Sequence, residues 1–167
     1  ERFPEASFII IGDYLFEQLE AYIALNPPTN PTTLVRAAGC GTCAGIAEAL
    51  RCVPADSPVT LVWSDLYLRS KPVWPDTRQP IICTTAAFPC RWSIDENGEI
   101  TERTSDQRGI PGLFHLSSRS ALPPIPTEGE FVSWWSETIR HFSSLRHDDL
   151  EELGDFATIE QLNDREG

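Results

Sequence analysis

The chain has 167 residues, of which 41% are hydrophobic and 23% are charged, and this length and balance suit one folded domain with a buried core. Its formal net charge of −12 argues against nucleic acids and anionic membrane surfaces as partners, because both attract clustered Lys and Arg. No run of 18 apolar residues is present, so the sequence predicts no membrane span.

The first part of the chain alternates short apolar runs with amphipathic segments. "SFIIIG" is a run of strand formers, and "DYLFEQLEAYIAL" has apolar residues at helical spacing, with Asp13 placed to cap it. "NPPTNP" then breaks the helix. The predicted order is strand, helix, strand, helix, strand, at residues 7–12, 13–25, 32–38, 43–53 and 58–68. Such alternation predicts an α/β fold whose sheet is at least partly parallel.

The second part of the chain loses this alternation. An apolar stretch at residues 81–88 precedes two short strands around Asn97-Gly98, a strong hairpin signal, and we expect this hairpin to close the sheet. The acids Asp95, Glu96 and Glu99 are interpreted as turn formers. A helix is predicted over residues 128–145, where Thr127 and Glu130 form a capping box ahead of an apolar stripe.

The turn between the second strand and the second helix carries Cys40-Gly41-Thr42-Cys43. Two cysteines at this spacing can form a disulfide, and a helix N-terminus stabilises a thiolate on the first of them. Cys40 would then attack a substrate disulfide, and Cys43, one turn further in, would resolve the mixed disulfide. Gly39 and Gly41 would let a substrate backbone approach closely.

At this motif the sequence resembles the thioredoxin-like superfamily, in particular thiol-disulfide oxidoreductases of the TlpA/MauD kind. "TLVRAAGCGTCAGIAEAL" is similar to the strand, redox motif and helix of that family, and "AFPCRWSIDENGEITER" is similar to its proline and hairpin segment. The resemblance implies a three-layer sandwich with a central mixed sheet and flanking helices over residues 1–146. Residues 147–167, with eight acids and one Arg, would form an acidic C-terminal helix or tail.

The resemblance also implies a function and a site. The chain would exchange its dithiol with a protein substrate that carries thiols or a disulfide, without an organic cofactor or a metal. Gly41 and Thr42 would contact that substrate together with Phe88 and Pro89, and Pro89 would follow a cis peptide bond. Since the sequence starts at Glu1 and contains no Met, we expect an extracytoplasmic protein whose signal or anchor has been removed.

Two alternatives remain open. "GCGTCAG" also resembles the glycine loop of an S-adenosylmethionine-dependent methyltransferase, in which Asp65 could hold ribose hydroxyls. The other alternative is a redox-inactive interaction module, with a structural zinc on Cys40, Cys43, Cys83 and Cys90.

Overall fold

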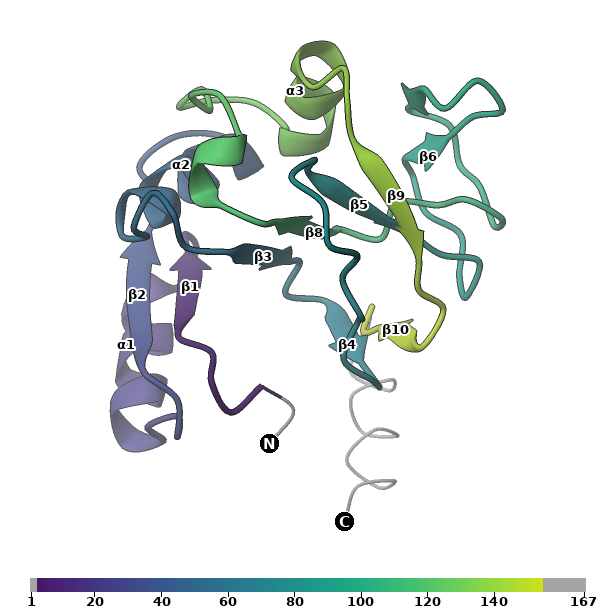
Figure 1. Ribbon diagram of the computed structural model, residues 1–167. Coiled ribbons are helices and arrows are strands. Elements are labelled where there is room, and N and C mark those ends of the chain that lie inside the picture. Colours follow the sequence, from purple (N-terminus) through teal and green to yellow (C-terminus); the bar gives the residue numbers. More distant parts are fainter. Residues whose placement is uncertain (1–2, 155–167) are drawn as a thin grey trace. The chain divides into compact units, whose positions relative to one another are not determined.

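The computed structural model describes residues 3–154, which divide into two compact units (Figure 1). The first unit holds residues 3–58 and 117–140, and the second holds residues 59–116 and 141–154. Within the described residues there are three α-helices and four separate sheets, so the protein is a mixed α/β protein. None of the helices in residues 3–154 is long and apolar enough to cross a membrane.

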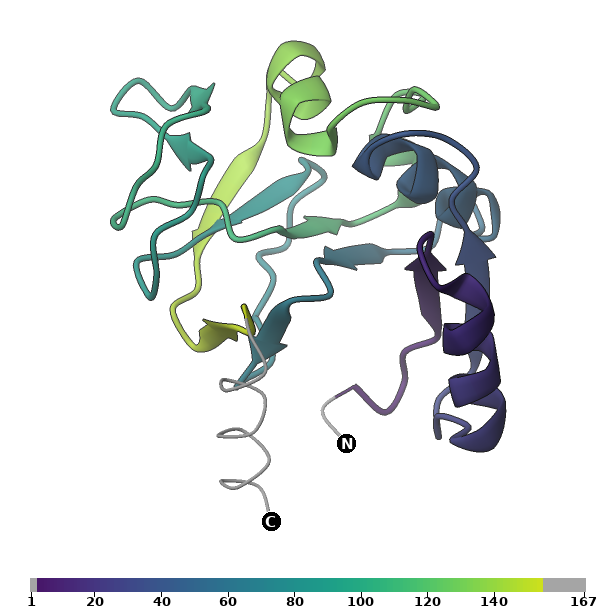
Figure 2. The ribbon, with the colours of Figure 1, turned by 180° about the vertical axis from the view of Figure 1, so that it is seen from behind.

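The first unit contains two parallel strands and all three helices. Its elements are β1 (Phe8–Gly12), α1 (Phe16–Leu25), β2 (Thr32–Arg36), α2 (Thr42–Arg51), the 3-10 helix η1 (Arg119–Ala121) and α3 (Phe131–Thr138). β1 and β2 pair in parallel with Phe8 opposite Thr32 and Gly12 opposite Arg36, as the alternation in the sequence predicts. α1 makes the connection and lies in front of these strands in Figure 2.

Glycines bring both helices close to β1. A methyl group placed on Gly12 would lie 2.9 Å from the ring of Phe16 in α1. One placed on Gly45 of α2 would lie 2.4 Å from the side chain of Ile11. Because Ile11 and Gly12 are neighbours in a strand, they point to opposite faces, so α1 and α2 cover different faces of β1.

The helix predicted over residues 128–145 is shorter than expected. The N-cap residue of α3 is Glu130, and its side chain makes no capping hydrogen bond. The predicted capping box of Thr127 and Glu130 is therefore wrong. Ile139 already has an extended backbone (φ −94°, ψ 101°), and the chain continues into β9 (Ser143–Arg146). Residues of β9 pair with β5 (Ile81–Thr84), and this strand pairing overrides the helical spacing of the apolar residues.

The second unit is built on a four-stranded sheet in the order β3-β8-β5-β9. β8 (Leu113–Leu116) is antiparallel to β3 (Val59–Val62) and to β5, whereas β5 and β9 are parallel. β8 lies between two other strands, β3 and β5, in this sheet. The core of this unit comes from the fully buried side chains of β5 and β8, including Ile81, Ile82, Cys83, Leu113, Phe114 and Leu116.

The strand predicted over residues 58–68 is broken in two. After β3 the chain turns at Trp63, whose N–H donates to Gly112 O at 3.0 Å, and it resumes as β4 (Leu66–Leu68). β4 pairs with β10 (Leu150–Glu152) in an antiparallel two-stranded sheet. The predicted boundary at residue 147 stays a prediction, and residues 155–167 of the acidic segment lie outside the described residues.

The hairpin around Asn97-Gly98 is confirmed. β6 (Ser93–Ile94) and β7 (Ile100–Thr101) are antiparallel, and Gly98 has the positive φ of 83° that such a turn requires. The hairpin does not close the main sheet as we expected, because β6 and β7 form a sheet of their own. The strands of the described residues therefore do not form the one central mixed sheet of a thioredoxin-like sandwich.

Candidate functional site

The predicted dithiol turn is crossed by another segment of the same unit, residues 127–131. The N–H of Cys43, in the first turn of α2, donates to Gly129 O at 3.0 Å, and the N–H of Gly129 donates to Cys40 O at 2.9 Å. Thr42 Oγ1 accepts a hydrogen bond from the N–H of Phe131 at 2.7 Å. The start of α2 is therefore bound by the protein's own chain.

The glycines of the turn make room for this segment. A methyl group on Gly39 would lie 2.3 Å from Thr127 O, and one on Gly41 would lie 2.4 Å from Gly129 O. Both distances are far below van der Waals contact with backbone atoms that cannot turn aside. Residues 127–131 thus lie against Gly39 and Gly41, where we expected a substrate backbone to approach.

The cysteines of the described residues carry no disulfide. All five are free thiols; Cys40 and Cys52 are exposed, whereas Cys43, Cys83 and Cys90 are buried. Burial, and secondly the charge of Glu130, raises the pKa of the Cys43 thiol. Burial also raises the pKa of Cys83 to about 12 and that of Cys90 to about 11. Raised pKa values keep these three sulfurs protonated and unreactive at neutral pH.

The other predicted contacts lie in the second unit. Phe88 is half-buried and Pro89 is exposed, in the loop after β5. Every peptide bond within residues 3–154 is trans, so the predicted cis bond before Pro89 is wrong. The predicted site thus draws Gly41 and Thr42 from one unit and Phe88 and Pro89 from the other.

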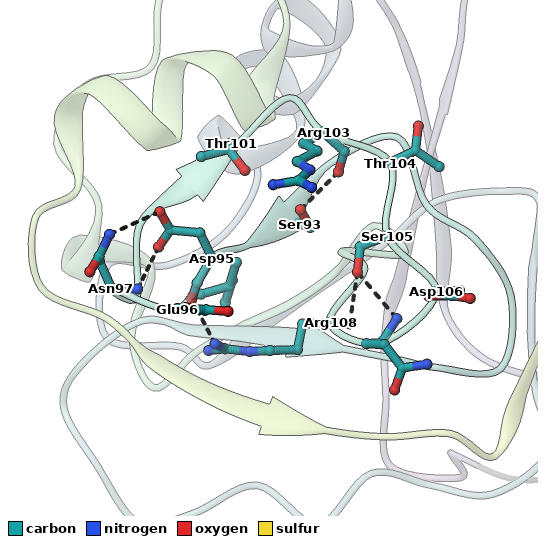
Figure 3. A pocket seen from close by; sticks show the side chains of 12 residues that line it. Ser93, Asp95, Glu96, Asn97, Thr101, Arg103, Thr104, Ser105, Asp106 and Arg108 are labelled. Atoms are coloured by element: carbon teal, nitrogen blue, oxygen red, sulfur yellow. Dashed lines mark hydrogen bonds between the residues drawn. The ribbon is translucent and has the colours of Figure 1, made fainter.

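The second unit has a polar cavity of about 660 Å³ between the β6–β7 hairpin and the loop that follows it (Figure 3). This volume lies within the range of small-molecule sites, which is roughly 300–1,000 Å³. Its lining is rich in hydroxyl, carboxylate and guanidinium groups: Ser93, Ile94, Asp95, Glu96, Asn97, Thr101, Arg103, Thr104, Ser105, Asp106, Gln107 and Arg108.

Much of this lining is held in place by internal hydrogen bonds. Asp95 Oδ1 accepts the N–H groups of Glu99 and Asn97, both at 2.9 Å. These bonds lower the pKa of the Asp95 carboxyl, and the bond from the Glu99 N–H has the largest effect. Arg108 donates to Asp95 O at 2.6 Å, and Ser105 Oγ accepts the N–H of Arg108 at 3.2 Å. Arg108 therefore braces the hairpin against the loop.

Two polar groups that line the cavity have no hydrogen-bond partner among the described residues. Within the described residues, no hydrogen bond or ion pair engages the guanidinium of Arg103, which lies between Thr101 and Ser93 in Figure 3. Thr101 Oγ1 is buried without a hydrogen-bond partner among the described residues. The exposed guanidinium of Arg103 can bind the oxygens of a phosphate, whereas the buried Thr101 hydroxyl is out of reach of a ligand.

This cavity was not predicted from the sequence. The interpretation of Asp95 as a turn former is confirmed, because its carboxylate binds the backbone of the turn. Arg103 and Arg108 belong to no recognisable sequence motif. Only the folded hairpin and loop show that they line the same cavity.

Comparisons with known proteins define the class of fold. No protein-family model and no curated protein sequence matches the chain. Solved structures do match the chain, and at 14% identity the similarity is one of fold.

The particular neighbours are three solved chains. HddC from Yersinia pseudotuberculosis is 14% identical with a TM-score of 0.73, over 98% of this chain and 80% of that one. The same protein complexed with GMP-PN is 14% identical with a TM-score of 0.68, over 95% of this chain and 78% of that one. A nucleoside-diphosphate-sugar pyrophosphorylase from Vibrio cholerae RC9 is 14% identical with a TM-score of 0.62, over 95% of this chain and 81% of that one.

These neighbours overturn the resemblance to thioredoxin-like oxidoreductases and the thiol-disulfide exchange that it implied. The order of the motifs in the sequence was similar to that family, but the fold is not. The free thiols of the described residues and the trans bond before Pro89 agree with this correction.

Proposed function

We propose that the protein is a nucleotidyltransferase that joins a nucleoside triphosphate to a sugar 1-phosphate. The observation that carries the proposal is the similarity of fold to HddC over 98% of the chain. A neighbour bound to GMP-PN and another named as a nucleoside-diphosphate-sugar pyrophosphorylase support nucleotide and sugar phosphate as the two substrates.

The proposed reaction is a displacement at phosphorus. A phosphate oxygen of the sugar 1-phosphate attacks the α-phosphorus of the triphosphate and forms a new phosphoanhydride bond. The bond between the α- and β-phosphates breaks, and pyrophosphate leaves with its electron pair. No proton or redox partner is needed, because the attacking oxygen is already ionised at neutral pH. The protein must mainly align two anions and reduce their repulsion.

We assign the polar cavity of the second unit to the phosphorylated sugar. The free guanidinium of Arg103 supplies the positive charge that a phosphate requires, in a chain whose net charge of −12 would otherwise repel it. The hydroxyls and carboxylates around it, such as Thr104 and Asp106, are groups that hydrogen-bond to sugar hydroxyls.

Nucleotidyl transfer commonly uses a divalent cation. Among residues 3–154 no three His, Cys, Asp or Glu side chains are grouped so as to hold a metal.

Pyrophosphate release tests the proposal. The full chain, with magnesium, is given each common nucleoside triphosphate together with a panel of hexose 1-phosphates, and pyrophosphate is measured against time. We expect release that depends on both substrates. Arg103→Gln should raise the KM for the sugar phosphate by roughly 10- to 100-fold, the value of one charge-assisted contact.

Arg91→Gln is the matched control. Arg91 is exposed, pairs with Glu102 at 2.5 Å and does not line the cavity, so its loss should change the KM by less than about twofold. Equal effects of the two substitutions would contradict the assignment of the cavity, and release with no pair of substrates would contradict the function.

A further inference from the structure

The connection between β4 and β5 in the second unit is an irregular strap. This strap, residues 69–80, contains no helix or strand (Figure 1). No residue from 72 to 78 makes a backbone hydrogen bond to another backbone group of the described chain. Pro72 and Pro80 are buried, whereas Val73 is 86% exposed. Side-chain packing therefore holds the strap in place, and segments of this kind open at a low cost in free energy.

Trp74 attaches the strap to His115 of β8. The two rings are stacked, with their centroids 4.5 Å apart and an angle of 7° between their planes. Both side chains are half-buried. On its other side, His115 Nδ1 lies 3.1 Å from Thr60 Oγ1 of β3. A hydroxyl donates to a neutral imidazole and accepts from a charged one, so this hydrogen bond is compatible with both forms of His115.

The sheet offers His115 no opposite charge. Thr60 on β3 and Ile81 on β5 lie directly opposite it. Cys83 lies on the same face as Ile81, and its thiol is protonated because burial raises its pKa to about 12. Burial also lowers the pKa of His115 from its ordinary value of 6.5, so the closed strap favours the neutral ring. The charged residues of the strap are Arg69, Lys71, Asp76 and Arg78.

We propose that the strap is an acid-sensitive latch, in which protonation of His115 breaks its stack with Trp74 and releases residues 69–80 from the sheet. An open strap exposes the imidazole to water, so the open form binds a proton more readily than the closed form. The closed strap is therefore most stable above pH 6.5 and loses stability as pH falls through the lower pKa of the closed form. Since one proton is involved, the opening equilibrium changes by at most about tenfold per pH unit.

A cation–π contact would act in the opposite direction. A charged imidazole is attracted to the face of an indole, and this attraction would hold the strap closed in acid. It would also raise the pKa of His115, whereas burial by the strap lowers it. Removal of Trp74 therefore distinguishes a latch from a cation–π clamp by the sign of the change in pKa.

The pKa of His115 is measured by NMR of the full chain with isotope-labelled histidine rings, between about pH 8 and pH 5. The chain has three His, and His141→Gln and His147→Gln identify the His115 signal by elimination. We expect Trp74→Ala to raise the pKa of His115 toward 6.5, because the ring becomes exposed. Val73→Ala, at the exposed neighbouring position, should leave it unchanged. A pKa that falls or stays the same in Trp74→Ala would overturn the proposal.

Fluorine NMR of the fluorotryptophan-labelled protein reports on the strap itself. The five Trp give five signals, and Trp74→Phe identifies that of Trp74. We expect this signal to move toward that of the free amino acid as pH falls, with the same midpoint as the titration of His115. In His115→Gln it should not change with pH.

Circular dichroism shows whether His115→Gln is folded, and the two midpoints of the wild-type protein decide the question if it is not. A Trp74 signal that stays constant while His115 titrates would overturn the latch. So would a Trp74 signal that still changes with pH in folded His115→Gln, because another group would then be the trigger.

Discussion

Replacing Gly41 by Ala is the sharpest test of how the turn before α2 is built. Gly41 has φ 82° and ψ 174°, a backbone region that only glycine adopts readily. The new methyl group would lie 2.4 Å from Gly129 O and 2.7 Å from Gly129 C. Since both are backbone atoms, the 127–131 segment would have to move.

The cost has two parts. The backbone conformation contributes about 1–3 kcal/mol. Displacing the segment also weakens the Cys43 N–H···O Gly129 and Gly129 N–H···O Cys40 hydrogen bonds, at about 1 kcal/mol each. We expect Gly41→Ala to lower the free energy of unfolding by about 3–5 kcal/mol.

Gly129→Ala is the matched control, because Gly129 has φ 99° but nothing within 4 Å of an added methyl group. It should show only the conformational part, about 1–3 kcal/mol. Urea unfolding followed by far-UV circular dichroism measures both variants. If Gly41→Ala is no more destabilising than Gly129→Ala, the close contact between the turn and the 127–131 segment is not real.

Two further outcomes follow from the described residues. Alkylation of the native, unreduced protein should show fast reaction of two thiols, Cys40 and Cys52, and slow reaction of the three buried ones; a mass showing a Cys40–Cys43 disulfide would refute this. The pKa of Asp148 is lowered, first by the N–H of Ala86 and then by Arg146. Its stabilising effect is therefore present above the unfolded value of about 3.9 and is lost as pH falls through the lower folded value. Asp148→Asn should remove part of this acid dependence and, after screening by solvent, cost about 1 kcal/mol at pH 7. The matched control is Asp149→Asn at the exposed neighbouring position, which should cost less than about 0.5 kcal/mol in urea unfolding at pH 7.

The sequence predicts the local structure of this protein better than its long-range contacts. The alternation of apolar runs over residues 7–68 and the Asn97-Gly98 turn are local signals, and the structure bears out the parallel β1–β2 pair and the hairpin. The glycines around Cys40 also fit a local pattern. The same pattern serves a loop open to substrate and a loop crossed by residues 127–131, and only the fold distinguishes them.

The candidate site could not be predicted for a related reason. Arg103 is one arginine in an irregular polar segment, and its value as a binding group depends on having no partner in the folded unit. The resemblance to oxidoreductases depended on the order of two motifs, Cys40 to Cys43 and Pro89. These motifs fall in different units of the structure.

Phosphorus NMR of one reaction mixture tests the central claim most directly. The full chain is incubated with magnesium, a nucleoside triphosphate and the hexose 1-phosphate that gives the fastest pyrophosphate release, and the products are followed over time. If the protein is a nucleotidyltransferase, we expect the two coupled diphosphate signals of a nucleotide sugar, which grow in equal amount with pyrophosphate. Triphosphate that stays intact, or that is hydrolysed without forming the nucleotide sugar, would contradict the proposed function.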